Sequence, residues 1–263
     1  MKAKVNGIEI NYEVSGKEGA PWLVLSHSLA CTVRMWDPTV AAFKDKFRIL
    51  NYDMRGHGAT SVPQGPYTLD MLADDVLALM KELKIQKAVY CGLSIGGMIG
   101  QTIAIRGGHP FTRMVFADTT HTQPPEAIKQ WEDRIHIAQT KGMAGLVDST
   151  MERWFTKPYR DQNSPAYQKI RELVAKTPVP GFIGCGQAIM KLNTTARLKD
   201  IKVPVLAITG EMDGAAPGTK YIGEHVPGAK YVGIPNAAHI ANVEQAEAFN
   251  RALRDFLRGP ASA

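Results

Sequence analysis

The chain has 263 residues, of which 44% are hydrophobic and 21% are charged. These proportions are ordinary for a globular protein and exclude a disordered, collagen-like or disulfide-framework protein. Lysine and arginine total 31 against 25 aspartate and glutamate residues, which gives a net charge of +6. Because the basic residues are dispersed and form no recognition motif, nucleic acid is not an expected partner.

The number of cysteines and the lengths of the apolar runs indicate the cellular compartment in which the protein is expected. Cys31, Cys91 and Cys185 are too few and too scattered for a disulfide framework or a cysteine metal site, so we expect free thiols in a reducing compartment. The N-terminus lacks the apolar core of a signal peptide, and no apolar run approaches the roughly 18 residues of a membrane helix. The sequence therefore predicts a cytoplasmic, soluble protein that is not bound to a membrane; no motif predicts its oligomeric state.

The first part of the chain predicts strands that alternate with helices. Asn6-Gly7 lies between two alternating segments and indicates a β-hairpin. Later strands are continuous apolar runs, which are typical of a parallel sheet covered on both faces. Asp37, followed by Pro38, is expected to cap a helix. The predicted strands are residues 4–6, 8–14, 22–26, 47–52, 88–91 and 113–117, and the predicted helices are residues 37–46, 69–83 and 95–106.

The strand pattern stops after residue 118 and returns near residue 203. The segment between contains only helical patterns separated by prolines, and it is much longer than an ordinary crossover connection. We therefore expect an α/β core formed by residues 1–118 and 198–263, interrupted by a helical cap at residues 119–197. The predicted cap helices are residues 126–141, 146–155 and 166–176; the predicted core elements that follow are strands at 203–209 and 230–234 and a helix at 243–257.

A G-x-S-x-G motif stands between a predicted strand and a predicted helix. It comprises Gly92 to Gly96, with Ser94 at its centre. This motif alone is a weak signal, but in a strand–turn–helix context it is typical of a serine nucleophile on a strained turn. Glycines are needed beside that serine because side chains there would clash with the neighbouring strand and helix. Ser94 is the predicted nucleophile.

A neutral serine needs a base, and the base needs an orienting acid. Of seven histidines, including His27 and His57 in core loops, His239 lies where the chain order Ser…Asp…His requires the base. Asp213 follows the strand at 203–209 and can accept a hydrogen bond from the imidazole. Asp118 follows the strand at 113–117 and is a rival orienting acid.

The tetrahedral intermediate of acyl transfer needs two hydrogen-bond donors for its oxyanion. The residue after the nucleophile supplies one backbone N–H, which is that of Ile95. The second is expected from the loop after the strand at 22–26, and we assign it to the N–H of Leu29.

Aromatic and cationic side chains in the predicted cap suggest a substrate pocket with an apolar wall and a cation for a carboxylate. The alternative is that the aromatics pack the cap and the cations are solvated. We expect Trp154 and one cation to contact the substrate, and Arg34 beside the predicted oxyanion loop is an equally good candidate. The cap residues of this kind are Trp131, Trp154, Phe155, Arg134, Arg153 and Lys191.

These motifs resemble the α/β-hydrolase family over nearly the whole chain. The segments SHSL, DMRGHG, GLSIGG, GEMD and AAH occur in the family's order. Within the family, LSHSLA, NYDMRGHGAT, CGLSIGGMIGQ and AAHIANVEQAEAF are most similar to 3-oxoadipate enol-lactonases. The resemblance implies an eight-stranded sheet with a helical cap and a triad of Ser94, Asp213 and His239. It implies no metal and no organic cofactor.

The sequence therefore predicts a serine hydrolase that cleaves a small lactone or ester through an acyl-enzyme. By resemblance, the substrate is 3-oxoadipate enol-lactone or a related, carboxylate-bearing lactone of aromatic compound degradation. A general carboxylesterase or perhydrolase, or a carbon–carbon bond hydrolase, would use the same triad. A ligand receptor with an inactive site on the same fold is the alternative from a different class.

Overall fold

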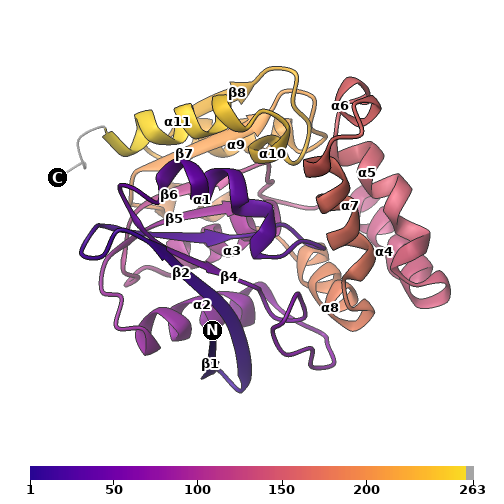
Figure 1. The fold of residues 1–263 in the computed structure, drawn as a ribbon, viewed down its shortest axis with the longest axis horizontal. Helices are drawn as coiled ribbons and strands as arrows, with labels where there is room; N and C mark the ends of the chain where they lie inside the picture. Colours follow the sequence, from indigo (N-terminus) through magenta and orange to yellow (C-terminus); the bar gives the residue numbers. More distant parts are fainter. Residues whose placement is uncertain (259–263) are drawn as a thin grey trace.

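A mostly parallel sheet lies at the centre of the computed structural model, which describes residues 1–258 (Figure 1). The strand order is β1-β2-β4-β3-β5-β6-β7-β8, and β2 runs antiparallel to β1 and β4. All other pairings are parallel. The strands are β1 (Lys2–Val5), β2 (Ile8–Gly16), β3 (Trp22–Ser26), β4 (Arg48–Tyr52), β5 (Ala88–Leu93), β6 (Phe111–Ala117), β7 (Val205–Gly210) and β8 (Lys230–Ile234).

Helices cover both faces of this sheet, as its apolar strands require. They are α1 (Asp37–Phe43), α2 (Leu69–Glu82), α3 (Ile95–Arg106), α9 (Ala216–His225), α10 (Ala241–Glu244) and α11 (Ala246–Arg258). α1 packs on α11 at one face, and α2 packs on α3 at the other (Figure 1). Within residues 1–258, no helix has the length and apolar character needed to cross a membrane.

The insertion between β6 and β7 is helical. Its members, which we call the cap helices, are α4 (Pro125–Lys141), α5 (Val147–Trp154), α6 (Lys157–Asp161), α7 (Pro165–Lys176) and α8 (Val179–Met190). Figure 1 shows them grouped beyond one edge of the sheet. An isolated bridge between Thr122 and Asn193 joins the two ends of the insertion.

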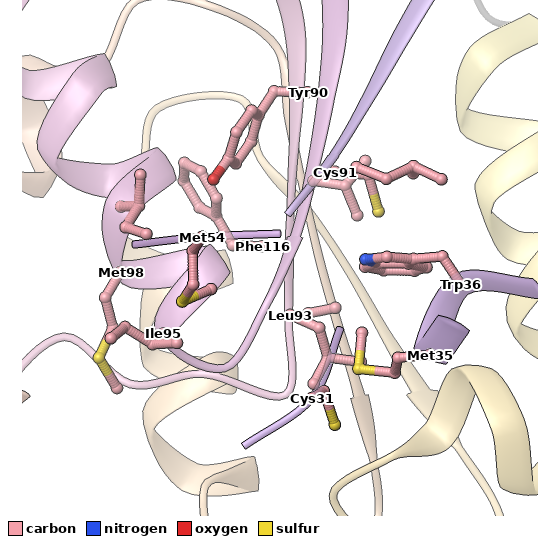
Figure 2. Packing of buried hydrophobic residues seen from close by; sticks show 14 of the residues in the cluster. Cys31, Met35, Trp36, Met54, Tyr90, Cys91, Leu93, Ile95, Met98 and Phe116 are labelled. Atoms are coloured by element: carbon pink, nitrogen blue, oxygen red, sulfur yellow. The ribbon is translucent and has the colours of Figure 1, made fainter. Parts of the chain in front are cut away.

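The core continues from the sheet into the loop after β3. Figure 2 shows Cys31 and Met35 of this loop in the same buried cluster as Leu93, and all three are fully buried. Leu93 is the residue before Ser94, so the packed core reaches the predicted nucleophile. All three cysteines of the chain are free and buried.

Most of the predicted elements form, and the differences have local causes. Asn6 and Gly7 both adopt positive φ in the turn of the hairpin, as the pair predicts. The prediction that Asp37 caps α1 was wrong: a 3₁₀ helix at Val33–Trp36 makes Trp36 the N-cap, and Asp37 pairs with Arg34 and Lys169. The predicted closing helix is divided into α10 and α11 by Gln245, which has a non-helical backbone.

Helix α8 was not predicted, because its segment is rich in proline and glycine. Pro180 occupies the first turn, where its missing N–H removes no intrahelical bond. The glycines allow the helix to contact core loops closely: a Cβ atom on Gly181 would lie 1.9 Å from the carbonyl oxygen of Gly56, and one on Gly184 would meet the ring of Tyr67 at 2.7 Å. Tertiary packing therefore outweighs the low helix propensity of these residues.

Candidate active site

Ser94 lies on a strained turn between β5 and α3. Its backbone has φ 58° and ψ −118°, a region that residues with a side chain rarely adopt. Neighbouring glycines make this turn sterically allowed: a Cβ atom on Gly92 would lie 2.2 Å from the carbonyl oxygen of Gly96, and one on Gly96 would lie 2.3 Å from that of Ser26. The turn places Ser94 at the N-terminus of α3, where the positive end of the helix dipole favours a developing anion.

His239 and Asp213 are joined by a hydrogen bond of 2.9 Å between Nδ1 and Oδ2. Because a carboxylate oxygen is an acceptor, Nδ1 of His239 is the donor in this bond, and Nε2 is the ring atom left for another partner. Asp213 follows β7, and His239 lies in the loop between β8 and α10. Both side chains line the same cavity as Ser94. The structure thus brings together the three residues that the sequence predicted as a triad.

Asp118, the rival acid, has other partners. Its Oδ1 atom accepts hydrogen bonds from the backbone N–H of Gly210 at 2.7 Å and from the hydroxyl of Thr209 at 3.2 Å. Burial, and next the negative charge of Asp213, raise the pKa of Asp118 well above its usual value. These hydrogen bonds hold Asp118 against the end of β7, from which the chain runs on to Asp213.

The loop after β3 presents Leu29 to the cavity. The next residue, Ala30, has a positive φ of 58°, and its N–H donates to Nε2 of His57 at 3.1 Å. Nδ1 of His57 donates to the carbonyl of Arg55 at 3.1 Å, so His57 is neutral with a defined tautomer. Burial, and next the charge of His27, lower the pKa of His57 to about 3. His57 therefore holds the loop that carries one predicted oxyanion donor, while Ile95 begins α3 with the other.

A cavity of about 970 Å³ lies between the strand ends and the cap helices. Its size is at the upper end of the range for small-molecule sites. Trp154 of α5 forms part of the wall, and its ring lies 5.9 Å from that of His239. Arg153, also on α5, lines the same cavity. Arg153 is nevertheless an exposed residue, and its Nε atom donates to the carbonyl of Ser149 at 3.2 Å.

Two of the candidate cations, Arg34 and Lys191, lie elsewhere. Arg34 forms ion pairs with Glu13 and Asp37, and its side chain is 42% exposed. Lys191 follows α8 and is exposed. Among the described residues, neither of the two belongs to the wall of the cavity. Arg34 was expected at the substrate because it is close in sequence to the proposed oxyanion loop. Its side chain instead pairs with Glu13 of β2.

Arg134 of α4, one of the candidate cations of the predicted cap, lines the cavity, and its spacing of three positions from Trp131 places both residues on one helix face. One residue that connects parts of the site was not assigned from the sequence. Glu244 connects the cap to the His239 loop: Oε1 accepts from the N–H and the hydroxyl of Thr156, and Oε2 accepts from the N–H of Ala238. The sequence carried no signal for this connection, because Thr156 and Ala238 lie 88 and 6 residues from Glu244 along the chain.

The family described as the alpha/beta hydrolase fold matches residues 21–246. The chain belongs to this family. Hydrolases of this family place a nucleophile at the strand-to-helix turn that Ser94 occupies here.

Several similar proteins are enol-lactonases. The chain is 33% identical to 3-oxoadipate enol-lactonase 2 of Acinetobacter baylyi, over 95% of this chain and 94% of that protein. The crystal structure of the enol-lactonase from Burkholderia xenovorans LB400 superimposes with a TM-score of 0.94 and 39% identity, covering 98% of this chain and all of that one. A bifunctional esterase/perhydrolase of Acinetobacter calcoaceticus is 26% identical over 96% of this chain and 97% of that protein.

Proposed function

We propose that this protein is a serine hydrolase that opens a small lactone, with 3-oxoadipate enol-lactone as its substrate in the degradation of aromatic compounds. The observation that carries the proposal is the position of Ser94. It occupies a left-handed backbone conformation at the N-terminus of α3 and shares a cavity with the hydrogen-bonded pair of His239 and Asp213. Similarity to enol-lactonases over nearly the whole chain supports the substrate.

In the proposed mechanism, Oγ of Ser94 attacks the lactone carbonyl while Nε2 of His239 takes its proton. Asp213 holds the imidazole and stabilises the imidazolium that forms. The amides of Leu29 and Ile95 bind the oxyanion of the tetrahedral intermediate.

Ring opening follows when the C–O bond breaks and His239 protonates the leaving enol oxygen. Because the substrate is a lactone, the leaving group remains attached to the acyl chain on Ser94. The enol becomes a ketone, and water, activated by His239, hydrolyses the acyl-enzyme and releases a keto acid.

Labelling and turnover together test this function. A fluorophosphonate probe should label the wild-type protein and leave Ser94→Ala unlabelled, and purified wild-type protein should hydrolyse enol-lactone faster than simple aryl esters. Absence of labelling together with absence of turnover would overturn the hydrolase proposal in favour of a ligand receptor.

A general esterase or perhydrolase is the second candidate, and the size of the cavity favours it. A volume of about 970 Å³ leaves room for acyl or alcohol groups larger than a five-membered lactone. Faster turnover of aryl esters than of enol-lactone in the same substrate panel would select this function.

A further inference from the structure

We propose that Glu244 is a positioning residue that ties His239 to the cap, so that the proposed base is held in place only while the cap is seated on the core. This inference rests on the proposed hydrolase function and deepens it, because it names a residue that acts on the reaction through His239.

Glu244 lies between the cap and the segment that carries His239. Its Oε1 atom accepts hydrogen bonds from the N–H of Thr156 at 2.9 Å and from the hydroxyl of Thr156 at 2.5 Å. Its Oε2 atom accepts from the N–H of Ala238 at 2.8 Å. Only 7% of Glu244 is exposed. One buried carboxylate therefore joins the connection between α5 and α6 to the residue directly before His239.

A second bond joins the cap to the residue directly after His239. The N–H of Ile240 donates to the carbonyl of Trp154 at 3.3 Å, and the indole of Trp154 lies 5.9 Å from the imidazole of His239. The backbone on both sides of His239 is thus bonded, directly or through Glu244, to the cap. Asp213 orients the imidazole ring through Nδ1, whereas the bonds from the cap hold the backbone that carries the ring.

The hydroxyl of Thr156 serves this connection and not its own helix. Thr156 is the N-cap residue of α6, a position where a threonine side chain commonly accepts a hydrogen bond from the first turn. Its side chain forms no such cap and donates to Glu244 instead. A bond that would stabilise α6 is therefore replaced by one that crosses from the cap to the core.

A carboxylate is the side chain that suits this place. Two N–H groups and one hydroxyl point at it, and each needs an acceptor because it is buried. A carboxylate offers two acceptor oxygens, whereas a glutamine amide replaces one of them with an NH₂ group that cannot accept. Glu244→Gln should therefore break the connection either to Thr156 or to Ala238, with almost no change in volume.

Displacement of His239 would slow the attack by Ser94. Proton transfer needs Nε2 within hydrogen-bond distance of the hydroxyl, and a misplacement of about 1 Å can cost about 100-fold in rate. Trp154 and Thr156 both line the cavity, so a substrate packed against this part of the cap would also support the contacts that hold His239. Substrate binding and proton transfer are thereby coupled through one segment of the cap.

The rate of inactivation by a fluorophosphonate tests this role, because it depends on Ser94 and His239 and needs no natural substrate. Glu244→Gln should lower the second-order rate constant of labelling about 10- to 100-fold. Thr156→Val, which keeps the N–H and loses the hydroxyl, should lower it about three- to tenfold, and Thr156→Ser should lose less. In a His239→Ala background, Glu244→Gln should cause no further loss, because Glu244 acts through His239.

Lys169→Gln is the matched control, because it removes a different contact between the cap and the core. Lys169 of α7 pairs with Asp37 of α1 at 2.9 Å, and among the described residues neither of the two belongs to the cavity wall. This variant should be labelled at the wild-type rate. Urea unfolding of each variant shows whether labelling is measured on folded protein, and Thr156→Val decides the test if Glu244→Gln does not fold.

Two results would overturn the proposal while leaving the hydrolase function intact. One is labelling of the folded Glu244→Gln and Thr156→Val variants at the wild-type rate. The other is an equal loss from Glu244→Gln with and without His239, which would mean that Glu244 acts on the reaction by another route.

The orientation of His239 can also be followed without any reaction. Its Nδ1 proton, bonded to Asp213, should give a downfield ¹H NMR signal that is absent from His239→Ala. This signal should shift upfield or broaden in Glu244→Gln and remain in Lys169→Gln. An unchanged signal in Glu244→Gln would overturn the positioning role. The expected change in a protein that no fluorophosphonate labels would support the connection and contradict the hydrolase function.

Discussion

Nε2 of His57 accepts a hydrogen bond from the N–H of Ala30, the residue that follows Leu29 in the proposed oxyanion loop. The bond is 3.1 Å long and holds Ala30 in a left-handed conformation. His57 thereby orients the peptide next to a proposed donor, and among the described residues it does not belong to the wall of the cavity. We infer that it is a positioning residue for the proposed oxyanion hole.

Replacing His57 should therefore affect turnover more than substrate binding. We expect His57→Leu, which leaves the N–H of Ala30 without an acceptor, to lower kcat about 10- to 100-fold with little change in KM. His57→Gln, whose side-chain oxygen can accept, should recover part of the loss. Steady-state kinetics on one ester substrate would measure both, and a loss confined to KM would contradict the assignment.

Acid should weaken the contribution of His57 to stability. Its pKa of about 3 in the fold lies below the value of 6.5 for an exposed histidine, so the unfolded chain binds the proton first as the pH falls. The stability that neutral His57 contributes is complete above about pH 6.5 and is lost towards pH 3. Urea unfolding should show the difference between wild type and His57→Gln shrinking by about 1.4 kcal/mol per pH unit below pH 6. A constant difference between pH 8 and 5 would refute this.

Asp213 and Asp118 should respond differently to the same substitution. Asp213→Asn removes the carboxylate that orients His239 and should lower kcat about 10⁴-fold. Asp118→Asn should lower kcat less than about tenfold, because Asp118 makes its hydrogen bonds to Thr209 and Gly210 instead. The reverse order of effects would assign the orienting role to Asp118.

The contribution of Asp118 to stability should depend on pH in the opposite direction to that of His57. The pKa of Asp118 is raised in the fold, so its contribution is present at low pH and is lost as the pH rises through the folded value. Wild type should therefore lose stability relative to Asp118→Asn on going from pH 5 to pH 8. Urea unfolding at the two pH values measures the change.

Ser94 and His239 should act as one unit. Ser94→Ala is expected to lower turnover about 10⁴- to 10⁶-fold, and adding His239→Ala should cost little more, because the base has no function without its nucleophile. A double variant whose loss equals the product of the two single losses would mean that the residues work independently.

The sequence predicted most of the core because its signals are local. The apolar run of β3 and the glycines around Ser94 each specify a conformation within a few residues. The pair of His239 and Asp213 was predictable because the family's chain order brings both to the ends of neighbouring strands. Arg34 was misplaced because its partner Glu13 is 21 residues away, and no local pattern encodes that pairing. Arg134 was only one of several candidate cations, because the packing of the cap helices decides which of them line the cavity.

The contact between Gly181 of α8 and Gly56 limits which substitutions the cap can accept. Gly56 adjoins His57, so a side chain at position 181 would press on the backbone beside the residue that holds Ala30. Helices α4 and α5 face the cavity with Arg134 and Arg153, where a substitution would change the cavity wall. We therefore expect changes of specificity to arise on this side of the cap, whereas position 181 of α8 admits nothing larger than a hydrogen atom.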